Sequence, residues 1–189
     1  MLALLGVAAC GPAVPPDGTA VGIEPTLPAG YPPKIGDVTA DLGGGTRGWD
    51  LYDYSIGAYD ASVQVYDNNG QATFRLMGQQ VGKPDTEVDR LVIGAEMTAQ
   101  TQTGALAKPV IEIVAGRDWD GGRLSSVGST ASVVLDSLTP MGPQGTYGHV
   151  TGHFSAVLCA ATGNPARVDK AACQPFKGTF DSDLQIGGP

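Results

Sequence analysis

Apolar and polar residues alternate in short runs along most of the chain from about Asp37 onward. The clearest example is the pair of segments 61–66 and 71–76, in which every second residue is apolar. A period of two is typical of half-buried antiparallel strands. The intervening Asp-Asn-Asn-Gly sequence at 67–70 tolerates or supplies the positive φ angles that a tight hairpin needs. The pattern therefore predicts a β-hairpin over 61–76.

Two later segments, 147–159 and 176–186, show one apolar and one polar face. The even positions carry apolar residues such as Phe154 and Phe180, whereas many odd positions carry polar ones. Each segment is therefore predicted to be a strand with one buried face and one solvent-facing side. In the connection between them, Asn164-Pro165 is a sequence that caps and starts helices, and it predicts a brief helical turn extending to Ala171.

Further alternating or apolar runs occupy 88–97, 110–115 and 132–138, and no long stretch has helical periodicity. Seven to ten short strands at this spacing predict an all-β fold, either an antiparallel β-sandwich or a squat β-barrel. The expected domain covers residues 37–189. A chain of 189 residues that is 42% hydrophobic is long enough for one such core.

The segment before this domain has a different composition. Half of the 14 prolines fall within residues 11–36, mixed with glycines. Proline lacks an amide donor and favours extended conformations, so residues 10–36 are expected to form a semi-stiff linker with a reach of about 75 Å.

Composition and charge narrow the function classes. The chain has 28 Gly and 14 Pro, and 19 acidic residues against 11 basic ones give a net charge of -8. High Gly and Pro content argues against a helix bundle, and an acidic chain lacks the basic face that nucleic-acid binding requires. No nucleic-acid partner is therefore expected.

Residues 1–9 form an apolar run that is too short to cross a membrane, which takes about 20 residues. Val7-Ala8-Ala9-Cys10 resembles the bacterial lipobox. The resemblance implies that 1–9 is a residual signal peptide and that Cys10 carries a diacylglycerol with acyl chains such as palmitate, which anchors the protein to a membrane. No Lys or Arg precedes the run, which indicates a start upstream of Met1 or a trimmed chain. Gly11 after the cysteine resembles the outer-membrane sorting signal of enterobacteria.

Three cysteines are an odd number. If Cys10 carries lipid, Cys159 and Cys173 remain as a pair in an exported, oxidised region, and a disulfide between them is the expected outcome. Closing a loop of about 15 residues stabilises a fold by roughly 3 kcal/mol in the chain-entropy model.

His149 and His153 are the only histidines. On a strand their Cα atoms lie about 13 Å apart, which is too far for two ligands of one zinc ion, so they are expected to form a solvent-facing row with Thr151. Asp118 and Asp120 are weak calcium candidates, because two acids fall short of the six to eight oxygen ligands that calcium takes. No metal site is expected.

Motifs that would indicate an enzyme are missing. There is no Gly-x-Ser-x-Gly turn and no phosphate-binding glycine loop, so the protein is expected not to be an enzyme and to hold no cofactor other than the lipid on Cys10. Exposed Trp and Tyr residues supply contact area for recognition. The candidate binding surface consists of Trp49, Tyr52, Tyr54 and Trp119.

These observations together predict a lipid-anchored protein of the bacterial cell envelope, with the outer membrane favoured, that binds another envelope protein or serves as a structural subunit. The alternative is a ligand-binding β-barrel lipoprotein, because Gly152-His153-Phe154 and Gly178-Thr179-Phe180 are similar to the last strands of lipid-anchored surface receptors. A third possibility, an envelope hydrolase, requires a cleft that gathers a histidine and several acids.

Overall fold

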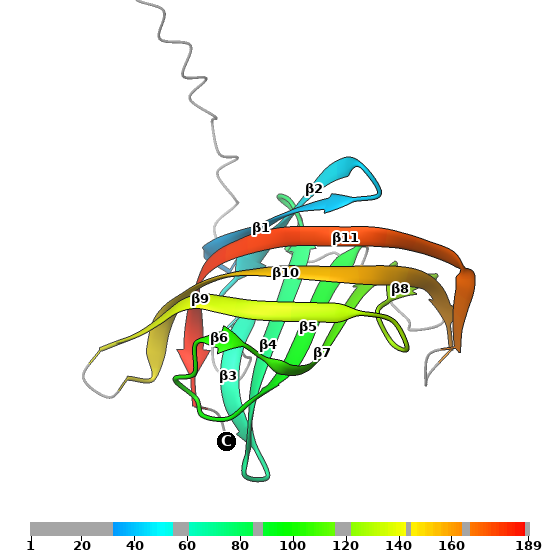
Figure 1. The fold of residues 1–189 in the computed structure, drawn as a ribbon. Coiled ribbons are helices and arrows are strands. Elements are labelled where there is room, and N and C mark those ends of the chain that lie inside the picture. Colours follow the sequence, from blue (N-terminus) through cyan, green and yellow to red (C-terminus); the bar gives the residue numbers. More distant parts are fainter. Residues whose placement is uncertain are drawn as a thin grey trace, which may run out of the picture.

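A computed structural model describes residues 32–54, 61–84, 89–115, 122–142, 145–163 and 167–187. These residues form eleven strands and no helix (Figure 1), which confirms the predicted all-β fold. The strands are β1 (Lys34–Leu42), β2 (Gly45–Tyr52), β3 (Val63–Asn68), β4 (Gln71–Gln80), β5 (Arg90–Met97), β6 (Gly104–Ala105), β7 (Ala107–Val114), β8 (Arg123–Ser125), β9 (Ala131–Met141), β10 (Tyr147–Thr162) and β11 (Arg167–Ile186).

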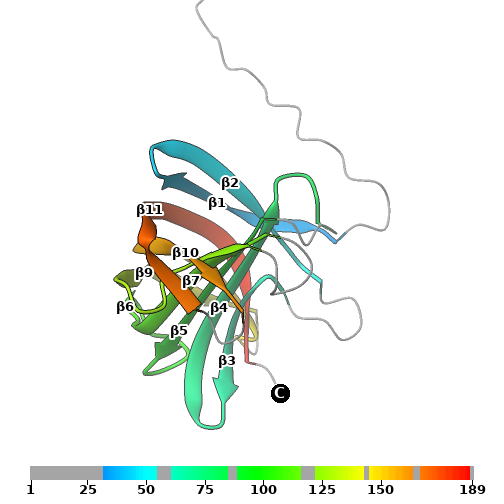
Figure 2. The same ribbon diagram turned by 90° about the vertical axis from the view of Figure 1, so that its right-hand side faces the viewer.

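All the strands belong to one sheet, in the order β2-β1-β11-β3-β4-β5-β7-β8-β10-β9-β6. Neighbouring strands are antiparallel except β11 and β3, which pair in parallel through Gln185 and Ile186. Two further pairings, β11 with β10 and β2 with β4, join strands that are distant in this order. The sheet therefore curves back on itself, as Figures 1 and 2 show, and its concave side encloses the core.

The long strands β10 and β11 form the longest ladder of the sheet. They pair from Tyr147 opposite Gln185 to Thr162 opposite Arg167. The predicted helical turn as far as Ala171 is wrong for residues 167–171, because the ladder with β10 continues through Asp169 and determines their conformation. Asn164 and Pro165 lie outside the described residues.

Aromatic rings on the inner face fill the core beneath β10 and β11. The Phe176 ring packs 5.0 Å from that of Phe154 and 6.0 Å from that of Trp49, between ring centroids. Glycines make room for these rings: a Cβ atom at Gly178 would lie 2.7 Å from Cζ of Phe154. The alternation of glycine and phenylalanine on neighbouring strands is thus a packing requirement of this face.

The sheet begins at Lys34, three residues before the expected start of the domain at Asp37, so the last three residues of the 10–36 linker belong to β1. The rest of that linker up to residue 31, together with the 1–9 segment and Cys10, lies outside the described residues. Within the described part of the chain, no helix is long and apolar enough to span a bilayer.

Candidate functional site

Charged side chains cluster on the outer surface of four adjacent strands, β9, β10, β11 and β1. Alternation places these side chains outward, because their neighbours along each strand, such as Phe154 and Phe180, point into the core. We call this surface the His–Asp face. Its charged residues include Asp37, Asp136, His149, His153, Asp181 and Asp183, with Asp41 and Lys177 toward one end.

His149 lies between two aspartates of β11. Its Nδ1 atom is 2.9 Å from Oδ1 of Asp183, and its Nε2 atom is 3.1 Å from Oδ1 of Asp181. The two aspartates are two residues apart on one strand, so they share a face and hold the ring from both sides. An ionised carboxylate only accepts hydrogen bonds, so both contacts are hydrogen bonds when both ring nitrogens carry a proton.

His153 contacts β9 on the other side of β10. Its Nδ1 atom lies 3.0 Å from Oδ1 of Asp136. The partner of β10 changes from Ser137 to Leu135 as Thr151 is followed by Gly152, so Asp136 is the extra residue of a β-bulge. A bulge redirects a side chain that regular pairing would place elsewhere, and here Asp136 points toward His153.

The two histidines are solvent-exposed, with side chains 41% and 52% accessible, which confirms the predicted solvent-facing row. The two rings are held from different strands: His149 by two aspartates of β11, and His153 by one aspartate of β9. No group of three or more His, Cys, Asp or Glu residues within the described ranges is arranged to hold a metal ion.

Two shallow hollows adjoin on the His–Asp face. The first, of about 300 Å³, is lined by Asp37, Asp136, Asp181 and Thr151 among others. The second, of about 560 Å³, extends toward Lys177. Thr39 and Thr179, a directly opposed pair of β1 and β11, line both hollows. The second hollow also holds a carboxylate, that of Asp41, which lies directly opposite Lys177. Carboxylates therefore line both ends of the face, and the end at the second hollow carries a lysine as well.

Two large apolar side chains lie next to His149 on the same outer face, at the ends of β9 and β10. Tyr147 and Met141 are directly opposed on β10 and β9 and are 52% and 42% exposed. In Figure 1 the ends of β9 and β10 that carry them extend to the left of the other strands. Sequence reasoning missed this pair, although extending the alternation of odd positions from His149 back by two residues would have placed Tyr147 on the outer face.

Burial contradicts two of the four residues of the predicted aromatic binding surface. Trp49 is only 2% exposed, and its Nε1 donates a hydrogen bond to the carbonyl of Asp89 (2.7 Å). Tyr52 is fully buried. Tyr54 is partly buried and donates to the carbonyl of Pro84 (2.7 Å). Alternation along β2 turns Trp49 and Leu51 into the core together, and Tyr52, on the opposite side of the strand, is buried beside Asp50. The predicted surface is therefore wrong for Trp49 and Tyr52. Trp119, Asp118 and Asp120 lie outside the described residues.

Tyr52 belongs to a buried polar cluster around Asp50. Oδ2 of Asp50 accepts hydrogen bonds from the Tyr52 hydroxyl (3.0 Å) and from the Gly82 amide (2.7 Å), and Oδ1 forms an ion pair with Nζ of Lys34 (3.1 Å). Burial, together with the Asp50 carboxylate, raises the pKa of Tyr52. Because Asp50 pairs with β4, this cluster is a structural element at the junction of β2 and β4.

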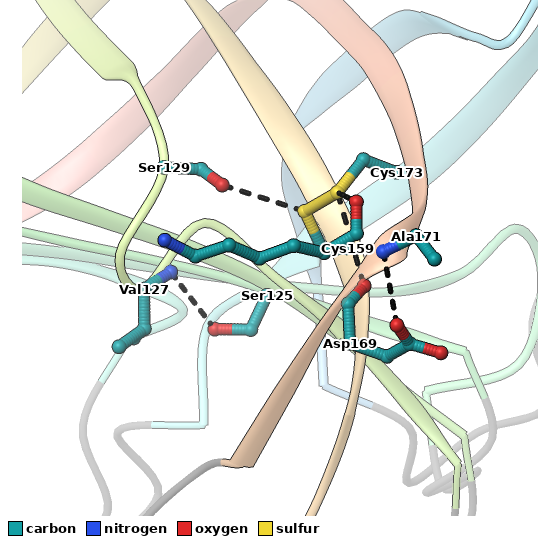
Figure 3. Close-up of a disulfide and its surroundings, with 8 residues drawn as sticks. Ser125, Val127, Ser129, Cys159, Asp169, Ala171 and Cys173 are labelled. Carbon is teal, nitrogen blue, oxygen red and sulfur yellow. Dashed lines mark hydrogen bonds between the residues drawn. A yellow bond between two sulfur atoms is a disulfide. The ribbon is translucent and has the colours of Figure 1, made fainter.

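The predicted disulfide is confirmed: Cys159 and Cys173 are bonded, with their Cα atoms 3.9 Å apart. The two residues are directly opposed on β10 and β11, three residue pairs before the end of the ladder farthest from Tyr147. Cys159 is buried and its Sγ lies 3.4 Å from Oγ of Ser129, whereas Cys173 is exposed (Figure 3).

Comparison with known proteins adds no family to this description. No protein-family description, curated protein or solved structure matches the chain.

Proposed function

We propose that this chain is a lipid-anchored protein of the bacterial cell envelope that binds another envelope protein through the His–Asp face. The observation that carries the proposal is the fixed presentation of charged side chains across β9, β10, β11 and β1. Cross-strand contacts orient His149 and His153, while packed aromatic rings occupy the inner face beneath them. A surface whose side chains are already ordered loses less conformational entropy on binding.

The sequence supports the compartment. Val7-Ala8-Ala9-Cys10 resembles a lipobox, and Gly11 favours the outer membrane by the same resemblance. The disulfide between Cys159 and Cys173 is the kind of bond that persists outside the cytosol. A net charge of -8 remains unfavourable for nucleic acid.

A second candidate function, binding of a small ligand, is favoured by the two adjoining hollows of about 300 and 560 Å³. These hollows lie on the outer face, so such a ligand would bind between Thr39 and Thr179 on the surface and not inside the curved sheet. Hydrolysis has less support, since the side-chain contacts of both histidines are with carboxylates and a nucleophilic triad needs a hydroxyl or thiol on one ring nitrogen. We therefore propose a binding protein and not an enzyme.

Mass spectrometry of the membrane-extracted protein tests the anchor. We expect an N-terminus at Cys10 with added acyl mass, and a Cys10→Ala variant that leaves the membrane fraction. A mature protein that still begins at Met1 would contradict the anchor.

Purification of the native assembly tests the binding role. Thr179→Arg places a long cation in the middle of the His–Asp face, and Thr103→Arg makes the same change at an exposed position outside it. We expect a stoichiometric protein partner to remain with the wild type and with Thr103→Arg, and to be lost from Thr179→Arg. A purified wild type that holds a small molecule and no protein would favour the second candidate function.

A further inference from the structure

We infer that the exposed pair Tyr147 and Met141, together with the adjacent acidic row, forms a docking surface for a protein segment that carries an apolar side chain next to an arginine or lysine. This inference rests on the proposed binding role and specifies the partner. Tyr and Met are among the residues enriched at the centres of protein interfaces. Here the two are directly opposed, and about half of each residue's surface is exposed.

The charge beside this pair determines the chemistry of the partner. His149 and Asp183 are directly opposed on β10 and β11. His149 is the next outward-facing residue after Tyr147 along β10, about 7 Å away. Two carboxylates, those of Asp181 and Asp183, contact the one imidazole. The row therefore remains negative even when His149 is protonated. A partner group that complements it is a cation about 7 Å from an apolar contact, which residues i and i+2 of a strand or i and i+4 of a helix provide.

The same negative charge disfavours other occupants. An envelope bilayer with anionic lipids would repel the aspartates next to Tyr147. A second copy of the chain docked through the same patch would bring carboxylates together, since a two-fold interface apposes identical surfaces. A cationic protein segment has neither cost.

The free edge of β9 suggests a second binding mode, the addition of a partner strand. Within the described residues, β6 pairs only with Val134 and Leu135 of β9, and no strand covers that edge along residues 136–141. Pro140 has no amide hydrogen and interrupts the row of donors that an added strand would need. Docking on the side chains of Tyr147 and Met141 is therefore favoured over strand addition.

Photo-crosslinking in the bacterium that produces the protein tests this surface. The photoreactive residue p-benzoylphenylalanine replaces Tyr147 or Met141 in the full-length chain. Control chains carry it at Val110 or Val127, which are 40% and 41% exposed elsewhere on the molecule. We expect one protein adduct from positions 147 and 141 at a yield about fivefold above the controls, and a crosslinked peptide with Arg or Lys within four residues of the attachment point.

Charge variants test the acidic row separately. Asp181→Asn with Asp183→Asn should lower the adduct yield about fivefold, as the loss of two exposed ion pairs predicts. Asp67→Asn with Asp169→Asn removes the same charge from exposed positions outside the face and should leave the yield unchanged. Equal losses from both double variants would overturn the inference.

The identity of the adduct separates the remaining outcomes. A lipid adduct, a crosslink to a second copy of this chain, or a partner peptide without a basic residue would overturn the docking surface. A protein adduct at Val110 or Val127 but not at Tyr147 or Met141 would also overturn it, while a protein-binding role would stand at a surface other than the His–Asp face. No protein adduct from any of the four positions would overturn both proposals.

Discussion

The two faces of the β10–β11 ladder contain different chemistry on the same backbone. The inner face is aromatic, with Phe154 and Phe176 in ring contact and Gly178 leaving space for them. The outer face is polar, with His149 held between Asp181 and Asp183. Tight packing leaves few acceptable substitutions on the inner face, whereas the outer face can change its side chains at little cost to stability. Stability therefore depends mainly on the inner face, and recognition is assigned to the outer one.

The largest expected effect comes from truncating the inner face. Phe176→Ala removes a ring that contacts both Phe154 and Trp49 and should lower the free energy of unfolding by about 3–5 kcal/mol, because the rigid sheet cannot collapse into the cavity. Urea denaturation measures the loss. Tyr147→Ala, on the outer face, is the control and should change stability by less than about 1 kcal/mol. Similar losses in the two variants would contradict the division between the faces.

The second largest expected effect concerns the disulfide. Cys159 occupies an odd position of β10, as the outward-facing His149 and His153 do. Replacing both Cys159 and Cys173 by Ala should lower the free energy of unfolding by about 3 kcal/mol, since the bond closes a loop between residues that are 14 positions apart in the sequence. Wild type unfolded in the presence of dithiothreitol should match the double variant. A double variant as stable as the oxidised wild type would show that β10–β11 pairing alone holds this end of the ladder.

A third effect concerns pH and the buried cluster at Asp50. The pKa of Tyr52 is raised above its ordinary value of 10.0 by burial and by Asp50. Partial burial acts to lower the pKa of Lys34, but hydrogen bonds to Asp37 and Asp50 outweigh it and raise that pKa as well. Both groups thus hold their protons more tightly when folded. Their stabilising contributions are full below about pH 10 and are lost as the pH rises through the folded-state values.

Thermal unfolding from pH 8 to 11 tests this expectation. The melting temperature of the wild type should fall by at least about 2–4 °C above pH 10, the shift that a change of about 1 kcal/mol gives in a chain of this size. Tyr52→Phe removes one of the two ionisable groups and should make the fall shallower. Tyr147→Phe, at an exposed position, should leave it unchanged. Identical pH profiles for the two variants would contradict the role of Tyr52.

The smallest expected effect belongs to the outer-face histidines. His149→Gln with His153→Gln should change the free energy of unfolding by less than about 1 kcal/mol, because exposed ion pairs contribute little. Urea denaturation of the double variant beside Phe176→Ala gives the sharpest contrast between the two faces. A loss above about 3 kcal/mol would place these contacts among the structural interactions of the fold.

The local pattern of apolar and polar residues was sufficient to predict which face of a strand is buried, because side chains alternate between the two faces with a period of two. Alternation over 147–159 and 176–186 predicted which sides of β10 and β11 are buried, and it placed His149 and His153 outward. The pairing of Cys159 with Cys173 followed from counting cysteines once Cys10 was assigned to the lipid. These predictions needed no knowledge of which strands are neighbours, because strand periodicity and cysteine number are properties of the sequence itself.

Tertiary structure alone decided which side chains meet across strands. The sequence does not encode locally that Asp181 and Asp183 hold His149, because that contact depends on the register between β10 and β11. The bulge that turns Asp136 toward His153 depends equally on the pairing of β9 with β10. Trp49 and Tyr52 were predicted at the surface and are buried, since the burial of an aromatic ring is determined by the strands that cover it and not by its own segment.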